Sequence, residues 1–168
     1  MRSPRGGGPL DPGPSVTIEL EAADSPVSAV LVEELEAHLE ARYPSSSRHG
    51  LTVERLVAEG VDFFVVRVDG DAVGCGGILF VDDADGRYGE LKRMFVRPES
   101  RGLGLGRARL ERLVEQARSR EISLVRLETG IHQSAAIGLY EAEGFRPIAP
   151  FGPYRDEQLT RCYELRLR

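Results

Sequence analysis

The segment of residues 97–107, R-P-E-S-R-G-L-G-L-G-R, combines three alternating glycines with arginines on both sides. It follows an apolar stretch typical of a strand and precedes an amphipathic stretch typical of a helix. Glycine tolerates positive φ and lets a ligand approach the backbone, and the amides at a helix N-terminus attract anions. The segment therefore predicts a binding site for a phosphate or pyrophosphate. A loop tightened only for packing is the alternative.

The glycine spacing excludes two common phosphate-binding loops. No Gly-Lys-Ser/Thr follows, which the loop of P-loop nucleoside triphosphatases requires. The glycines do not form G-x-G-x-x-G, and no acidic residue ends a second strand at the dinucleotide-binding spacing. The pattern that remains is R-x-x-G-x-G, formed by Arg101, Gly104 and Gly106.

Composition narrows the class of protein further. The chain has 168 residues, of which 41% are hydrophobic and 29% charged, as expected for one domain with a sizeable core. No apolar run approaches the ~20 residues of a membrane-spanning helix. Cys75 and Cys162 are far apart and the three histidines are scattered, so we expect no metal centre and interpret both cysteines as small core residues.

The first residues differ from the rest in composition. Residues 1–14 are rich in glycine and proline and lack the apolar stretch of a signal peptide. We predict a flexible tail over residues 1–14, a single domain over residues 15–168 and a cytoplasmic location.

The net charge of −5 is unevenly distributed. Residues 90–120 carry nine bases and four acids, whereas residues 16–59 carry nine acids and three bases. A local basic block in an acidic protein argues against nucleic-acid binding and is compatible with a compact polyanionic ligand. Part of the block is equally well explained as a solvated helix face, because Arg107 and Glu111 have helical pairing distance.

Hydrophobic periodicity predicts the element order βααβββαβαββ. The expected strands are residues 16–20, 63–68, 72–81, 90–96, 123–128, 145–148 and 162–167. Helices are expected after Pro26, at 52–59, after the glycine loop and at 134–143. The apolar stripe of the first helix includes Val27 and Val30, and that of the third begins at Leu103. Asp69-Gly70 predicts a tight hairpin turn, and residues 82–86 a second turn.

The residues at the end of the expected 134–143 helix predict the position of a tyrosine ring. With Gly144 as the left-handed terminator, Tyr140 and Phe145 occupy positions that commonly touch, which clamps the ring and leaves the hydroxyl free. A tyrosine that only fills the core is the alternative.

At this point the chain resembles a known family. R-x-x-G-x-G after a strand is similar to the coenzyme A pyrophosphate loop of the GNAT superfamily of acyl-CoA-dependent N-acyltransferases. Residues 136–145, A-I-G-L-Y-E-A-E-G-F, resemble that family's A-x-x-L-Y-x-x-x-G-F helix. The element order agrees over residues 15–168. One departure is Gln133-Ser134, where many members have asparagine.

The resemblance implies an α/β (α+β) fold. Its centre is a mixed, mostly antiparallel twisted sheet of about seven strands, with helices on both faces and strands 4 and 5 splayed apart. It also implies acetyl-CoA as co-substrate, without a metal. The backbone of Met94, Phe95 and Val96 would pair with pantetheine. The remaining cofactor-binding residues would be Arg101, Gly102, Leu103, Gly104, Leu105, Gly106, Arg107, Ser134 and Tyr140.

The implied chemistry is direct attack of a primary amine on the thioester in a ternary complex. In the family, a tyrosine at the position of Tyr140 protonates the leaving thiolate. Glu90 is our candidate for the base, because it begins the expected fourth strand, eleven residues before Arg101. Glu128 on the fifth strand is the competing base or a substrate-binding residue, and water is the third option.

The sequence does not identify the acceptor, although we expect a small molecule. Selectivity should lie in residues 42–59 and in the 151–154 loop, where Phe151 and Tyr154 are predicted to bind substrate. The acidic first third would favour a cationic amine. A homodimer is compatible with the sequence. The second interpretation is a non-catalytic acyl-CoA sensor or interaction module, which would need the loop but neither Tyr140 nor a positioned carboxylate.

Overall fold

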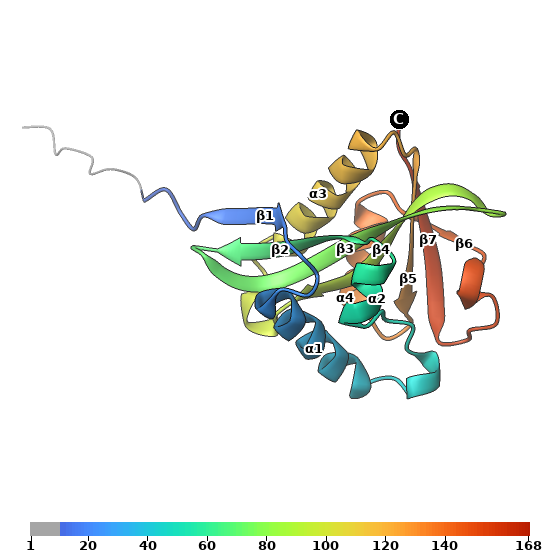
Figure 1. Ribbon diagram of the computed structural model, residues 1–168, viewed down its shortest axis with the longest axis horizontal. Helices are drawn as coiled ribbons and strands as arrows, with labels where there is room; N and C mark the ends of the chain where they lie inside the picture. The colour runs from blue at the N-terminus through green and yellow to red at the C-terminus, as the bar shows by residue number, and fades with distance from the viewer. Residues whose placement is uncertain (1–10) are drawn as a thin grey trace, which may run out of the picture.

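The computed structural model describes residues 11–168, which form a sheet with helices packed against it (Figure 1). The strands are β1 Val16–Leu20, β2 Asp62–Val68, β3 Asp71–Asp83, β4 Gly86–Val96, β5 Leu124–Gly130, β6 Arg146–Ile148 and β7 Thr160–Arg166. The α-helices are α1 Pro26–Glu40, α2 Val53–Ala58, α3 Leu105–Ser119 and α4 Ser134–Ala142. The predicted order is confirmed. Of the predicted tail, residues 1–10 lie outside the described residues, and residues 11–14 are exposed and outside any element.

The strands form one mixed sheet in the order β1-β2-β3-β4-β5-β7-β6. Every neighbouring pair is antiparallel except β4 and β5, which are parallel. The parallel pair needs a crossover, and α3 supplies it. The predicted mixed, mostly antiparallel sheet is therefore confirmed.

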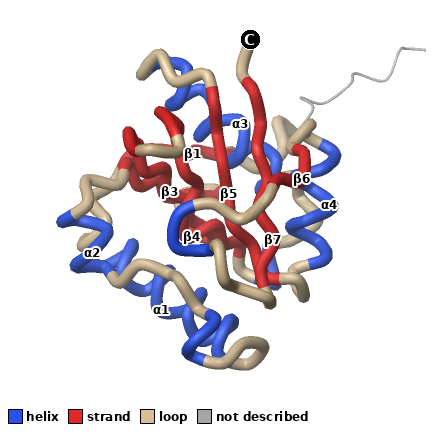
Figure 2. The backbone as a smooth tube through the Cα atoms, turned by 90° about the vertical axis from the view of Figure 1, so that its right-hand side faces the viewer, coloured by secondary structure: helices blue, strands red, loops and turns tan. Residues whose placement is uncertain are grey.

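Helices cover both faces of the sheet, as Figure 2 shows from the side. On one face α1 and α2 bury Leu31, Leu35 and Leu56 against β2 and β3. On the other face α3 and α4 bury Leu110 and Leu113 together with further side chains of β2, β3 and β5. The two apolar clusters hold the sheet between two helix layers, which is the arrangement that positions the site.

The sheet opens between β4 and β5. The two strands pair at only two registers, Gly89 with Val125 and Glu90 with Arg126. Beyond Glu90, β4 continues to Val96 without a partner on its β5 side, so the predicted splay is confirmed.

Local turn chemistry explains several element boundaries. Ser25 caps α1 by accepting a hydrogen bond from the Ser28 backbone N–H at 3.1 Å, and Pro26 occupies the first turn. Asp69 and Gly70 both have positive φ, of 49° and 88°, as the tight β2–β3 turn requires.

The sequence-based start of the fourth strand is wrong. β4 begins at Gly86 rather than Glu90, because residues 86–89 pair with β3 and Tyr88 is buried under Phe151. Glu90 therefore lies inside the strand. The glycine and arginine around Tyr88 hid this pairing, since they break the alternation that marks a strand.

The predicted apolar stripes are also partly wrong. Leu103 is 59% exposed and precedes α3, whose N-cap is Gly104. Val27 and Val30 are exposed on α1, and Ser28 and Val32 are buried instead. The buried face of α1 is rotated by about one residue from the predicted stripe. The reason is that the buried face is the one that packs against the sheet, and the position of the sheet cannot be read from the helix alone.

Candidate active site

A pocket of about 430 Å³ opens where β4 and β5 separate. Its wall combines β4, the glycine loop, β5, α4 and the segment after α1. The predicted site residues that line it are Met94, Phe95, Val96, Arg101, Gly102, Gly104, Leu105, Gly106, Arg107, Glu128, Tyr140 and Tyr154. Glu90, Leu103, Ser134 and Phe151 do not line it. The fold thus gathers most of the predicted residues around one cavity.

The glycine loop leaves open space for an anion. Gly102 and Gly104 have positive φ, of 85° and 73°, and a β-carbon at either position would meet no atom within 4 Å. Gly104 is the N-cap of α3, and no side chain caps the helix. The first-turn amides thus remain available at the positive end of the helix. The loop thus offers the open backbone and the positive helix end that an anionic group requires.

Gly106 has a different role from its neighbours. A β-carbon there would lie 3.2 Å from Leu139 Cδ2, so this glycine permits α3 and α4 to pack closely. Arg107 forms ion pairs with Glu111 at 3.2 Å and with Glu143 at 3.1 Å. The structure thus contains the surface ion pair that is the alternative to cofactor binding for Arg107. The guanidinium is 64% exposed and lies near the loop.

The free edge of β4 provides the second feature. Phe95 and Val96 pair with β3 on one side, and no described strand pairs with them on the other. A bulge opposite Gly76 interrupts the register, and Arg93 within it has a φ of 52°. Unpaired backbone groups along β4 can bind an extended arm as an additional strand.

Tyr140 is fixed by the end of α4. The Phe145 N–H donates to the Tyr140 carbonyl at 3.0 Å, and the Gly144 N–H donates to the Glu141 carbonyl at 3.1 Å. Gly144 has a φ of 92°, and the rings of Tyr140 and Phe145 are 5.7 Å apart. This is a Schellman motif, so the predicted ring contact is confirmed. Burial raises the pKa of the Tyr140 hydroxyl, and the positive charge of Arg109 opposes that rise.

Glu90 is held within a buried polar cluster. The Tyr154 hydroxyl donates to Glu90 Oε1 at 2.6 Å, and Lys92 Nζ lies 2.7 Å from the same oxygen. Lys92 also donates to the Tyr154 hydroxyl at 2.8 Å. Glu90 is 5% exposed and lies behind the pocket wall. Its carboxylate is therefore engaged by Lys92 and Tyr154.

Glu128 has a different environment. It lies on β5, lines the pocket and forms no ion pair with any residue of the 11–168 range. Burial raises its pKa to about 7; Lys92 opposes this effect, and the negative charges of Glu90 and Glu157 add to it. A carboxyl group with a pKa near neutrality suits proton transfer.

A segment after α1 closes one end of the pocket. We call residues 43–50 the strap. At one end the Tyr43 hydroxyl accepts a hydrogen bond from the His132 N–H at 2.9 Å. At the other end His49 packs edge-on against Tyr154 with ring centroids 5.4 Å apart, and its Nε2 lies 3.0 Å from Glu157 Oε1. The strap thus spans from the end of β5 to the loop that carries Tyr154.

The strap residues were predicted only as part of the 42–59 segment, not individually. Tyr43 leaves no space for a side chain at Gly130, because a β-carbon there would lie 2.1 Å from its hydroxyl. An aromatic residue directly before a proline, at the end of a helix, was the available sequence signal.

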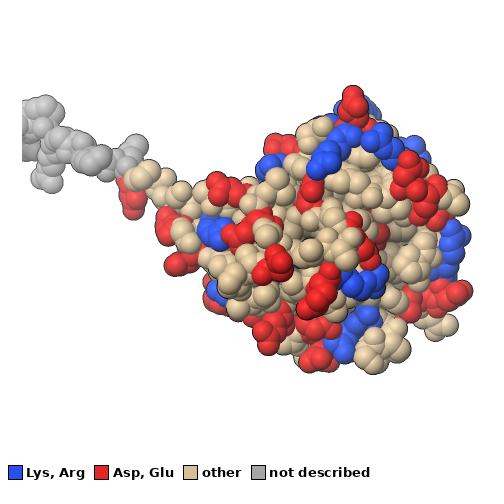
Figure 3. Space-filling model, viewed as in Figure 1, with Lys and Arg blue, Asp and Glu red and all other residues tan. Residues whose placement is uncertain are grey.

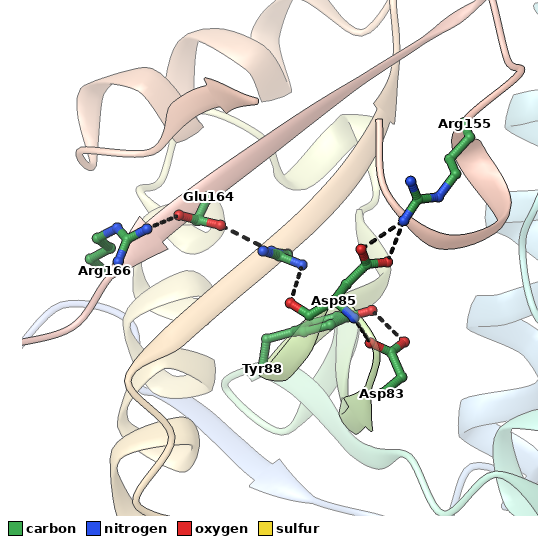
Figure 4. A network of polar contacts seen from close by, with 7 residues as sticks. Asp83, Asp85, Tyr88, Arg155, Glu164 and Arg166 are labelled. Carbon is green, nitrogen blue, oxygen red and sulfur yellow. Dashed lines mark hydrogen bonds and ion pairs between the residues drawn. The ribbon is translucent and has the colours of Figure 1, made fainter. Parts of the chain in front are cut away.

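The loop at the other side of the pocket is tied to the β3–β4 turn. Figure 4 shows Arg155 reaching Asp85, with both carboxylate oxygens within hydrogen-bond distance at 2.6 and 2.8 Å. Phe151 is buried between Tyr88 and Tyr154. Phe151 thus supports Tyr154 from behind, whereas Tyr154 itself faces the pocket.

The acids of the first third are mostly neutralised. Glu34 pairs with Arg97 at 2.8 Å, and Glu36 pairs with Arg48 at 2.6 Å and Arg93 at 2.8 Å. Figure 3 shows acidic and basic side chains intermingled on the visible face. This region therefore attracts a cationic acceptor less strongly than the excess of acids over bases in residues 16–59 would suggest.

Neither cysteine is placed for nucleophilic chemistry. Burial raises the pKa of the Cys75 thiol to about 12 and that of Cys162 to about 11, so both are neutral near pH 7. Within the described part of the chain, no three His, Cys, Asp or Glu side chains are grouped to bind a metal ion. None of the described helices is long and apolar enough to cross a membrane.

Comparisons with known proteins agree on one family. The model of the acetyltransferase (GNAT) family matches residues 28–145. The chain is 42% identical to an IAA acetyltransferase of Azospirillum brasilense, over 90% of this chain and 97% of that protein. It superposes on a putative acyl-CoA N-acyltransferase from Klebsiella pneumoniae with a TM-score of 0.73 at 33% identity, covering 91% and 98% of the two chains. An acetyltransferase from Salmonella typhimurium solved with acetyl-CoA has the same fold, with a TM-score of 0.66 at 21% identity, covering 91% and 94%.

Proposed function

Because the chain belongs to the GNAT family of acetyltransferases, we propose that its pocket transfers the acetyl group of acetyl-CoA to a small primary amine, with Glu128 and Tyr140 moving the two protons. Family membership makes the chain an acyltransferase with acetyl-CoA as its co-substrate. The residues that act and the class of acceptor are our proposal. The glycine loop holds the pyrophosphate of the cofactor, and the free edge of β4 pairs with its pantetheine arm.

The proposed reaction balances with two side chains. The amine nitrogen attacks the thioester carbonyl, the carbon–sulfur bond breaks, and its electron pair stays on sulfur. Glu128 accepts the proton that the amine loses, directly or through water. Tyr140 gives its phenolic proton to the sulfur. The products are an amide and free coenzyme A, without a covalent enzyme intermediate.

The observation that carries the choice of base is the contrast between two glutamates. Glu128 lines the pocket, forms no ion pair with a described residue and has a pKa raised to about 7. Glu90 lies behind the wall and is bound by Lys92 and Tyr154. A base needs a free lone pair within reach of the amine, which favours Glu128 over the sequence-based candidate Glu90.

The strap supports a small acceptor. It is attached at both ends, through Tyr43 and through His49, and five of its residues line the pocket. A peptide chain would have to displace these contacts, whereas a small amine fits beneath them. A lysine on a protein surface is therefore the less favoured acceptor.

The test is a panel assay with two readouts. The purified protein is incubated with acetyl-CoA and one candidate acceptor at a time. The candidates are small amines, a lysine peptide, and IAA, which the name of the Azospirillum brasilense relative contains. Released thiol and acetylated product are measured together. We expect stoichiometric thiol and amide with at least one small amine, and loss of both in Glu128→Gln. Binding of acetyl-CoA without turnover of any acceptor would favour the sensor interpretation. Activity restricted to the lysine peptide would refute the small acceptor.

A further inference from the structure

Arg109 is a buried cation that forms no ion pair with any carboxylate of residues 11–168. Its side chain, on α3, is 5% exposed. One nitrogen, Nη1, donates to the Cys75 carbonyl at 3.2 Å, and buried Nε has no partner. No carboxylate in the described chain forms an ion pair with it, although Arg93 and Arg97 each have a glutamate. A buried charge is costly unless it is paired, so its presence calls for an explanation.

The side chain of Arg109 forms part of the pocket wall. Arg109 lines the pocket together with Met94 and Tyr140. A β-carbon on Gly76 would lie 3.0 Å from Arg109 Cδ and 2.8 Å from Met94 Sδ, so these side chains converge over the β4 bulge. The positive charge of Arg109 opposes the rise that burial causes in the pKa of the Tyr140 hydroxyl. The guanidinium therefore lies near the free edge of β4 and near the proposed acid.

We infer that Arg109 stabilises the negative charge that forms on the sulfur of coenzyme A when the thioester bond breaks. This inference rests on the proposed function. The electron pair of the carbon–sulfur bond stays on sulfur, and Tyr140 then transfers its proton to that sulfur. The charge passes from sulfur to the phenolate oxygen, and Arg109 faces it in both places. A fixed cation in a site of low dielectric constant acts strongly on charge that develops during a reaction.

The competing explanation is structural. Through its hydrogen bond to the Cys75 carbonyl, Arg109 joins α3 to β3. The two explanations differ in what happens when the charge is removed. A structural tie predicts a less stable protein, whereas an unpaired buried cation replaced by an apolar chain predicts unchanged or higher stability.

The experiment compares Arg109→Met, Arg109→Lys and the control Arg112→Met. Arg112 lies on the same helix, where its guanidinium stacks on Phe64 away from the pocket. Each protein is titrated with coenzyme A and with desulfo-coenzyme A over a pH series. The ratio of the two affinities reports the ionisation of the bound thiol without turnover. Melting temperature and steady-state kinetics complete the set.

We expect the wild-type protein and Arg112→Met to bind the thiolate form preferentially, and Arg109→Lys to retain most of that preference. In Arg109→Met the bound thiol should ionise at least about one pH unit higher, a tenfold change in its ionisation constant. Its kcat should fall at least about tenfold while KM for acetyl-CoA changes little. Its melting temperature should not fall.

An Arg109→Met protein whose affinity ratio follows the wild-type pH course overturns the inference. So does a lower melting temperature accompanied by equal losses of affinity for both ligands, which is the structural result. Failure of the wild-type protein to bind coenzyme A would refute the proposed function and this inference with it. If the wild-type protein acetylates an amine and Arg109→Met has the same kcat and the same affinity ratio, only the inference is refuted and the proposed function stands.

Discussion

Replacing Glu128 with glutamine should make the protein more stable above neutral pH and, at the same time, much less active. The reason is that the folded protein holds this carboxyl in a site that disfavours its charge. Burial raises its pKa from the ordinary 4.5 to about 7. Glutamine has nearly the same shape and carries no charge.

The size of the effect follows from the shift in pKa. Each pKa unit corresponds to about 1.4 kcal/mol, so the shift of Glu128 makes ionisation cost at most about 3.5 kcal/mol in the folded state. A raised pKa means that the folded protein binds the proton more tightly than the unfolded chain does. The stabilisation is complete below pH 4.5 and is lost as the pH rises through about 7. Glu128→Gln should thus match the wild type at pH 4.5 and exceed it by roughly 1–3 kcal/mol at pH 8.

The assay is urea unfolding of both proteins across that pH range, together with pH–rate profiles for one accepted amine. The wild-type kcat/KM should rise as Glu128 loses its proton near pH 7. The variant should lose about 100- to 10,000-fold at neutral pH, the contribution of a positioned base. Its deficit should shrink as more amine becomes free.

Glu90→Gln is the matched control. It makes the same change at a nearby carboxylate that, unlike Glu128, is held by a cation and a hydroxyl. It removes the anion that Lys92 contacts at 2.7 Å and leaves a buried cation uncompensated. Breaking a buried pair in this way typically costs about 3–5 kcal/mol. Equal stability of Glu128→Gln and the wild type at pH 8 would refute our account of its burial. If Glu90→Gln loses activity with pH rescue and Glu128→Gln does not, Glu90 is the base.

Three further substitutions test the rest of the site. Tyr140→Phe keeps the ring on Phe145 and removes the proton donor, so kcat should fall about 10- to 1000-fold with an unchanged melting temperature; unfolding would instead favour a core role. Gly104→Val places a side chain in the open space of the loop and should weaken acetyl-CoA binding by at least ~2 kcal/mol in calorimetry, and unchanged affinity in a folded variant would contradict the loop assignment. Gly106→Val meets Leu139 instead, so thermal unfolding should show a loss of stability of about 1–3 kcal/mol, whereas a melting temperature like that of the wild type would contradict the packing role.

Much of the fold could be predicted because its signals are local. The Asp69-Gly70 turn, the Ser25 cap and the Gly144 terminator each depend on residues within one turn of the chain. The glycine loop likewise needs only its own φ angles and the start of α3. These local features were enough to place Tyr140 against Phe145 and to assign the family.

The tertiary structure alone decided which charged groups are free to act. The spacing in the sequence favours Glu90 over Glu128 as the base. In the structure, however, Lys92 and Tyr154 engage the Glu90 carboxylate, while burial raises the pKa of Glu128. Arg109 is one of eight arginines in the basic block, and only its burial reveals a charge that no described carboxylate pairs with. The strength of an electrostatic interaction depends on distance and on exclusion of water, and both are set by residues far apart in the chain.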